Sequence, residues 1–225
     1  MRAMARSVLV AMLIAGLCNL PSMAAVDKSL GVVAQAEHAR LDSVAVAVGA
    51  TVYSGDSFDT DASGTLRLRL GSSQLYLLPQ SSAKLAQSSS GAIVTLVSGT
   101  AGFSSPASGG LAVATPAGLL RASAGKAAYG QVTMHGEKEI LVSAFRGDLV
   151  LDNEGEFHNI PEGKSYRVEI SDDGDSRADD NPDFTPPVNH HRKRRLAFIL
   201  IFGGALAAGS YAIWQELSES PSKPK

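Results

Sequence analysis

Residues 65–70 alternate polar and apolar side chains without exception, and this pattern constrains the fold more than any other feature of the chain. Successive side chains of a β-strand point to opposite faces, so Leu66, Leu68 and Leu70 would line one face. The segment belongs to a longer run, 49–85, in which Gly-Asp, Ser-Gly and Gly-Ser-Ser turns separate three short strands. We therefore expect a β-domain in which strands bury one face each.

Similar strand patterns recur through residues 30–170, and turn-forming residues separate almost all of them. The 22 glycines and the few aromatic residues also favour a turn-rich β-protein over a helical one. Strands at this short, regular spacing indicate an all-β fold, either a sandwich or a β-solenoid. The predicted strands are 32–37, 65–70, 74–78, 93–97, 111–114, 127–134, 139–145, 149–152 and 165–170.

The first 24 residues have the three parts of a secretory signal peptide. Two arginines precede an apolar stretch of 11 residues (8–18), and Ser22 and Ala24 supply the small side chains that a cut after Ala24 requires. Eleven apolar residues are too few to span a bilayer comfortably. The only cysteine, Cys18, lies in this stretch, so the mature chain would have no disulfide. We expect the domain to be exported.

The C-terminal part contains a second apolar segment, residues 196–214, with 19 residues and no charge. A helix of that length, at about 1.5 Å per residue, spans roughly the hydrocarbon thickness of a bilayer. The sequence therefore predicts a signal peptide (1–24), a β-domain (25–170), an acidic, Pro-rich linker (171–195), one transmembrane helix (196–214) and a short polar tail (215–225). The linker ends in a basic run that flanks the membrane, formed by Arg192, Lys193, Arg194 and Arg195.

The two membrane-type segments conflict on orientation. Export of the domain leaves the basic run on the outer side of the membrane, whereas the positive-inside rule prefers the cytoplasmic side. We give precedence to the N-terminal signal, because it engages the export machinery first. We expect a membrane-anchored protein whose domain faces the bacterial periplasm or cell envelope, with a cytoplasmic domain as the alternative.

Charge and motifs argue against nucleic-acid binding and against known catalytic sites. Residues 25–189 contain 12 Lys and Arg against 20 Asp and Glu, whereas a nucleic-acid-binding domain normally has a basic face. The sequence has neither a Gly-x-Ser-x-Gly elbow nor a P-loop. Only His190 and His191 lie close together among the five histidines, and the acidic clusters lack calcium-loop spacing. We expect no enzyme activity, no cofactor and no metal site.

Several short motifs of the domain resemble, in their order and spacing, the FecR domain family. Gly, Gly-Asp, Thr, a small turn, an alternating strand, Gly-Ser and Pro-x-Ser are followed by Leu-Val-Ser-Gly, Thr-Pro-Ala-Gly and Phe-Arg-Gly, which together cover most of 31–170. We interpret the motif residues as fold residues, because glycines supply turns with positive φ and Asp and Thr cap turns. They are Gly49, Gly55, Asp56, Thr60, Gly64, Gly71, Pro79, Gly99, Thr115, Pro116 and Gly147.

The resemblance implies a periplasmic domain. The best-understood family members resemble the periplasmic halves of transmembrane regulators, which relay iron-siderophore receptor signals to a sigma factor through an N-terminal cytoplasmic domain. Here a signal-peptide pattern stands in place of that domain, so the domain type and its setting transfer rather than direct sigma-factor regulation. We expect a non-enzymatic, membrane-anchored envelope protein whose domain binds an envelope protein partner or senses a signal.

A carbohydrate- or peptidoglycan-binding module is the alternative, and an enzyme of unrecognised type is a third possibility. A deep pocket with facing carboxylates or a buried His-carboxylate pair would favour the enzyme. Carbohydrate sites often use aromatic platforms, so three aromatic side chains on one exposed face would favour that module, and burial of most of them would exclude it. The aromatic side chains available are Tyr53, Phe58, Tyr76, Phe103, Tyr129, Phe145, Phe157 and Tyr166.

Overall fold

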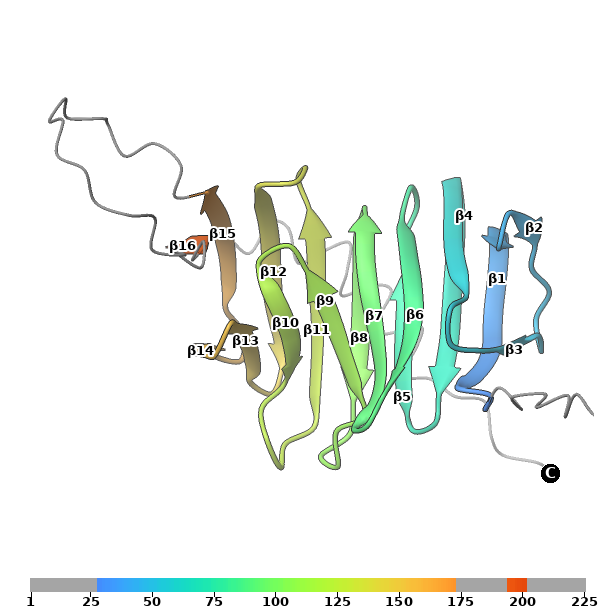
Figure 1. Ribbon diagram of the computed structural model, residues 1–225, viewed down its shortest axis with the longest axis horizontal. Coiled ribbons are helices and arrows are strands. Elements are labelled where there is room, and N and C mark those ends of the chain that lie inside the picture. Colours follow the sequence, from blue (N-terminus) through green and yellow to red (C-terminus); the bar gives the residue numbers. More distant parts are fainter. Residues whose placement is uncertain (1–27, 173–193, 202–225) are drawn as a thin grey trace, which may run out of the picture.

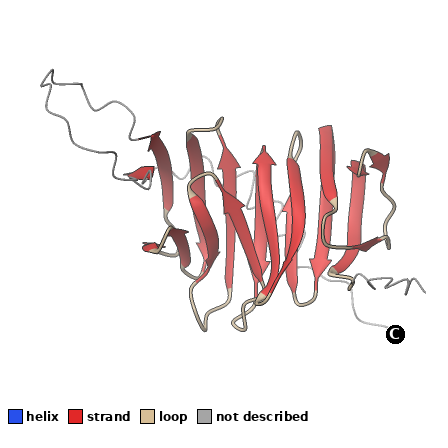
Figure 2. Cartoon of the chain, in the orientation of Figure 1, coloured by secondary structure: helices blue, strands red, loops and turns tan. Residues whose placement is uncertain are grey.

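The computed structural model describes residues 28–172 and 194–201, and these residues form strands and turns without a helix (Figures 1 and 2). This confirms the predicted all-β class, and every segment predicted as a strand lies in one. The strands are β1 (Gly31–Leu41), β2 (Val44–Ala45), β3 (Thr51–Val52), β4 (Ser57–Leu70), β5 (Ser73–Leu77), β6 (Ser82–Ser88), β7 (Gly91–Ser98), β8 (Thr100–Ser105), β9 (Leu111–Thr115), β10 (Gly118–Ala122), β11 (Ala128–Met134), β12 (Glu139–Arg146), β13 (Leu149–Asn153), β14 (Glu156–Ile160), β15 (Ser165–Asp172) and β16 (Arg194–Leu200).

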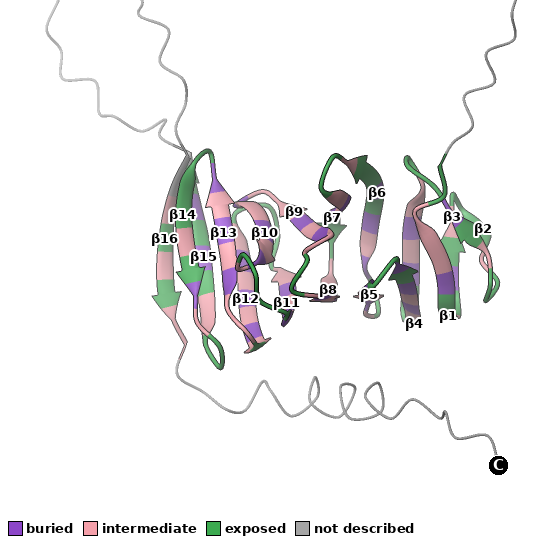
Figure 3. Ribbon diagram, turned by 90° about the horizontal axis from the view of Figure 1, so that it is seen from below, coloured by how far each residue is buried: buried purple, intermediate pink, exposed green. Residues whose placement is uncertain are grey.

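The strands form one sheet that divides into two layers at the long strand β4. One edge of β4 pairs with β1, and the other edge pairs with β6 through residues 57–59 and with β5 through residues 66–70. One layer continues from β5 through β8, β11, β12, β15 and β16, and the other from β6 through β7, β9, β10, β13 and β14 (Figure 3). All pairs are antiparallel except β7 with β9. The fold is therefore a curled, sandwich-like half-barrel rather than a β-solenoid, whose coils pair in parallel.

The inner faces of the two layers share one apolar core. Leu66, Leu68 and Leu70 are all buried on the inner face of β4, as their alternation predicts. The layers approach each other closely, because a Cβ added to Gly130 of β11 would lie 2.4 Å from the Cδ1 atom of Leu149 of β13. The outer face of each layer is left free for binding.

A buried polar network stabilises the chain where it crosses from β5 to β6 and thus from one layer to the other. The Thr60 hydroxyl donates to the carbonyl oxygen of Leu78 (2.6 Å) and accepts from the backbone N–H of Ser81 (2.9 Å). The Ser81 hydroxyl accepts from the N–H of Thr100 (2.8 Å) and donates to its carbonyl oxygen (3.0 Å). Thr60 and Ser81 are only 7% and 2% exposed, so these side chains replace water as partners of the backbone.

The beginning of the segment predicted as a transmembrane helix is a strand in the structure, contrary to the expectation. β16 pairs with β15 from Tyr166 opposite Leu200 to Asp172 opposite Arg194, and the Phe198 ring lies 4.3 Å from the imidazole of His158 on β14, measured between centroids. The physical reason is that periodicity cannot distinguish helix from strand in a short apolar run. Residues 196–200 alternate between half-buried and exposed, as a strand at a sheet edge does.

The other predicted targeting and linker segments are not covered by the structure. The signal peptide (1–24), most of the linker and residues 202–214 of the predicted span lie outside the described residues. Within the described part of the chain, no helix has the length and apolar character needed to cross a membrane.

Candidate functional site

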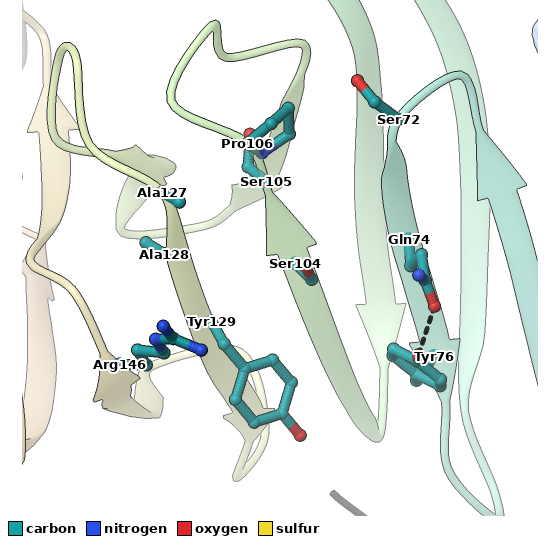
Figure 4. A pocket seen from close by; sticks show the side chains of 10 residues that line it. All are labelled: Ser72, Gln74, Tyr76, Ser104, Ser105, Pro106, Ala127, Ala128, Tyr129 and Arg146. Carbon is teal, nitrogen blue, oxygen red and sulfur yellow. Dashed lines mark hydrogen bonds between the residues drawn. The ribbon is translucent and has the colours of Figure 1, made fainter. Parts of the chain in front are cut away.

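An open groove of about 350 Å³ lies on the outer face of the layer that contains β5, β8, β11 and β12 (Figure 4). Its side chains come from these four strands and from the adjoining turns. The lining residues are Ser72, Gln74, Tyr76, Ser104, Ser105, Pro106, Ala127, Ala128, Tyr129 and Arg146. This lining contains neither a carboxylate nor a histidine, which are the usual general acids and bases.

The strand register arranges the outer-face side chains in two rows that cross β4, β5, β8, β11 and β12. Residues directly opposite each other on neighbouring strands lie close enough for their side chains to interact. The first row consists of Arg67, Tyr76, Gly102, Gln131 and Ser143. The second row consists of Arg69, Gln74, Ser104, Tyr129 and Arg146. Each tyrosine therefore has an arginine opposite it on the next strand outward, and β8 lies between the two pairs.

Gly102 forms the floor between the two tyrosines. A Cβ added at this position would lie 3.7 Å from the Tyr76 Cβ and 3.8 Å from the Tyr129 hydroxyl oxygen, which is ordinary contact distance. A glycine inside a strand weakens the strand and often marks a close approach by a ligand. Any side chain larger than alanine would fill the space between Tyr76 and Tyr129.

The Tyr76 wall is fixed by Gln74 and Arg67. The Gln74 Oε1 atom accepts hydrogen bonds from the Tyr76 hydroxyl (2.5 Å) and from the Nε (3.1 Å) and Nη2 (2.7 Å) atoms of Arg67. The guanidinium carbon of Arg67 also lies 5.3 Å from the centroid of the Tyr76 ring, within the range of a cation–π contact. Burial raises the pKa of the Tyr76 phenol and Arg67 partly opposes that shift. The phenol is therefore neutral at ordinary pH and can take part in hydrogen bonding.

The Tyr129 wall is supported from behind by Phe145. Their rings stack with centroids 5.3 Å apart and planes 28° apart. Burial, with a smaller contribution from Tyr76, raises the pKa of the Tyr129 phenol to about 12, so this group too is neutral at ordinary pH. Arg146 lies opposite Tyr129 in the register and is exposed. It forms no ion pair with any residue that the structure describes.

The aromatic side chains named from the sequence divide into core and surface groups. Phe58 and Phe103 are buried in the core, whereas Tyr76, Tyr129 and Phe145 gather on one outer face. This is the arrangement that the sequence argument required for a carbohydrate module. The remaining three, Tyr53, Phe157 and Tyr166, lie on other elements.

None of the motif residues named from the sequence lines the groove. Five of the glycines adopt positive φ at turns, where a residue with a side chain would be strained: Gly49, Gly55, Gly71, Gly99 and Gly147. Gly64 instead permits the close approach of β1, because a Cβ there would lie 2.3 Å from the carbonyl oxygen of His38. These glycines therefore determine the backbone path rather than the groove.

The polar and proline motif residues also lie at turns or layer crossings. The Asp56 carboxylate accepts from the backbone N–H of Tyr53 (2.8 Å), and Thr60 belongs to the buried network. The Thr115 hydroxyl donates to the carbonyl oxygen of Gly118 (3.0 Å) across the β9–β10 turn. Pro79 and Pro116 follow β5 and β9. Of the basic run, Arg192 and Lys193 lie outside the described residues, and Arg194 and Arg195 begin β16.

Other hollows and possible metal sites provide weaker candidates. Hollows of about 280 Å³ and 500 Å³ are lined without any aromatic side chain. Within residues 28–172 and 194–201, no group of three His, Cys, Asp or Glu side chains is placed to hold a metal ion. The groove therefore combines the aromatic and planar polar groups that the other hollows lack.

Sequence reasoning considered the tyrosines one by one and did not place Arg67, Gln74, Gly102 or Arg146 at a site. The alternation in residues 65–70 directs Arg67 outward, but only the strand order puts it beside Tyr76. Comparison with known proteins finds no matching model of a protein family and no matching curated protein. The resemblance to the FecR domain family therefore depends on the sequence motifs alone.

Proposed function

We propose that this chain is a non-enzymatic, membrane-anchored binding protein of the cell envelope whose β-domain binds carbohydrate in the outer-face groove. One observation carries the proposal: Tyr76 and Tyr129 face each other across the Gly102 floor. Aromatic rings provide flat apolar surfaces, and a few polar groups beside them fix the orientation of a ligand. The Nε2 amide of Gln74, which has no partner among the described residues, supplies such a group.

The sequence supports the location. The signal-peptide pattern in residues 1–24 favours export, and the apolar segment 196–214 favours an anchor in the membrane. The FecR-like motifs favour the periplasmic side. A domain in this position has the glycans of the cell envelope within reach.

The test is glycan binding by the full chain in detergent, measured by calorimetry with soluble peptidoglycan fragments and with a panel of oligosaccharides. Tyr76→Ala and Tyr129→Ala should each weaken binding about thirtyfold, since about 80 Å² of covered ring surface contributes about 2 kcal/mol. Tyr53→Ala, an exposed tyrosine away from the groove, is the matched control and should leave affinity unchanged.

Gly102 gives a second, independent test. Gly102→Val should block the groove and abolish binding while the domain stays folded, because a β-branched residue suits a strand. Gly102→Ala should preserve binding, since its Cβ would make ordinary contacts of 3.7 Å and 3.8 Å. Absence of binding to every glycan, or equal losses in Tyr53→Ala and the groove variants, would contradict the proposal.

The second candidate function is recognition of an envelope protein through strand addition at β14. β14 pairs only with β13, and its Phe157 side chain is 62% exposed. A free edge strand can accept an extended segment of a partner. Affinity capture from membranes should then retrieve one discrete envelope protein, and Phe157→Lys should lose it. Repeated failure with a folded bait would count against this function.

A further inference from the structure

Two arginines bracket the tyrosine walls of the groove. Arg67 lies opposite Tyr76, and Arg146 lies opposite Tyr129, at the outer ends of the five neighbouring strands β4, β5, β8, β11 and β12. With neighbouring strands about 4.8 Å apart, the two arginine positions are separated by about 19 Å along the sheet. One ligand lying across both tyrosines would therefore meet a guanidinium group at each end.

Neither of these arginines is neutralised by a carboxylate among the described residues. Arg40 and Arg167, by contrast, form ion pairs with Asp61 (3.0 Å) and Glu139 (3.1 Å). Arg67 donates to the neutral Gln74 amide instead. The domain is acidic in total, so two unpaired arginines beside a groove without any acidic lining residue stand out.

The acidic side chains that follow Arg146 in the chain have other partners. The Asp148 carboxylate accepts from Lys126 Nζ (2.9 Å) and from the backbone N–H of Glu162 (3.1 Å). The Glu162 carboxylate accepts from the backbone N–H of Gly147 (2.9 Å). These bonds hold both carboxylates in the turns, and the Arg146 guanidinium remains available for a ligand.

We infer that the groove selects an acidic glycan, with sugar rings between Tyr76 and Tyr129 and a carboxylate or phosphate at Arg146. The inference rests on the proposed function and deepens it by naming the ligand class. A guanidinium group binds carboxylate and phosphate through two parallel hydrogen bonds, which makes arginine the residue of choice for such anions. A neutral glycan would gain nothing from Arg146, since this side chain would stay solvated.

The test compares matched acidic and neutral oligosaccharides on the full chain in detergent. The carboxylate probe is hexagalacturonate, with its methyl ester as the neutral counterpart; the phosphate probe is mannopentaose 6-phosphate, with unphosphorylated mannopentaose. At least one acid should bind about tenfold or more tightly than its neutral partner, the range of a hydrogen bond to a charged group. Which acid shows the preference identifies the anion.

Substitution of Arg146 assigns the preference to this residue. Arg146→Gln should remove the preference for the acid while the neutral sugar binds as before, and Arg146→Lys should restore it in part. Arg121→Gln makes the same charge change on β10, in the opposite layer, and should leave the preference intact. Equal affinity for acid and neutral sugars, or an unchanged preference in Arg146→Gln, would overturn the inference and leave carbohydrate binding standing. Binding of none of the four probes would overturn the inference, while the wider glycan panel decides the proposed function separately.

Discussion

The buried network at the β5–β6 crossing predicts that Thr60→Val is strongly destabilising although it preserves the shape of the side chain. The substitution removes the hydroxyl that donates to Leu78 (2.6 Å) and accepts from Ser81 (2.9 Å). The Leu78 carbonyl and the Ser81 N–H then lose partners at a place where Thr60 is only 7% exposed, so water does not replace them readily.

The expected loss follows from the two unsatisfied groups. A buried polar group without a partner costs about 1–3 kcal/mol, and some relaxation of the turn reduces the sum for two groups to about 3 kcal/mol. The van der Waals volume hardly changes, so a cavity contributes little. For a chain of this size, a loss of about 3 kcal/mol lowers Tm by about 6–12 °C.

Urea and thermal unfolding of the full chain in detergent measure this loss. The matched control is Thr65→Val on the outer face of the same strand, where the Thr65 side chain is half-buried. This control should change the free energy of unfolding by no more than about 0.5 kcal/mol. A loss below about 1 kcal/mol in Thr60→Val, or equal losses in both variants, would refute the argument that the network stabilises the crossing.

Three further predictions follow from other parts of the fold. The Tyr129 phenol, with its pKa raised from 10.0 to about 12, should stay protonated through pH 10; its contribution to stability should be complete below pH 10 and lost between about pH 10 and 12, as phenolate absorbance and unfolding of the Tyr129→Phe variant will measure. Gly118→Ala should destabilise the domain by about 2–4 kcal/mol, because its φ is +132° and its Cβ would lie 2.3 Å from the Asp152 carbonyl oxygen; Gly136→Ala, at φ +90° with open space, should cost only about 1 kcal/mol in the same unfolding assay. In a Cys18→Ser background, cysteines at the register partners Glu169 and Ala197 should form an intramolecular disulfide under mild oxidation, whereas cysteines at Arg167 and Ala197, two residues out of register, should not; equal cross-linking of the two pairs would mean that β16 does not pair with β15 as described.

Local patterns were sufficient to predict the strands that carry an alternating or continuous apolar run. Residues 65–70 are the clearest case, since one face of that strand had to be buried. Strands rich in Ser, Gly and Ala were missed: β8, for example, reads TAGFSS and has no clear alternation. β8 is a strand because β5 and β11 pair with it on both sides, and that information is not local.

The groove was beyond local reasoning for the same reason. Tyr76, Gly102 and Tyr129 are 26 and 27 residues apart in sequence, and the hairpins between them belong to the opposite layer. Only the order β5–β8–β11 brings the three residues into contact. The tyrosines were named as possible platforms from their residue type, but the arginines opposite them gave no signal until the register was known.

The two assignments for residues 196–200 exclude each other, and this bears on how the domain is anchored. If β16 pairs with β15, the apolar segment that follows has 14 residues (201–214), or about 21 Å as a helix, which is short of the bilayer's hydrocarbon core of about 30 Å. A helix that uses the whole segment must release β16, which exposes the edge of β15 and removes Phe198 from His158 and Tyr166. The groove lies on β5, β8, β11 and β12, and none of its lining residues belongs to β15 or β16. Carbohydrate binding should therefore be the same in either state, so binding tests the groove and the Glu169–Ala197 cross-link tests the anchor independently.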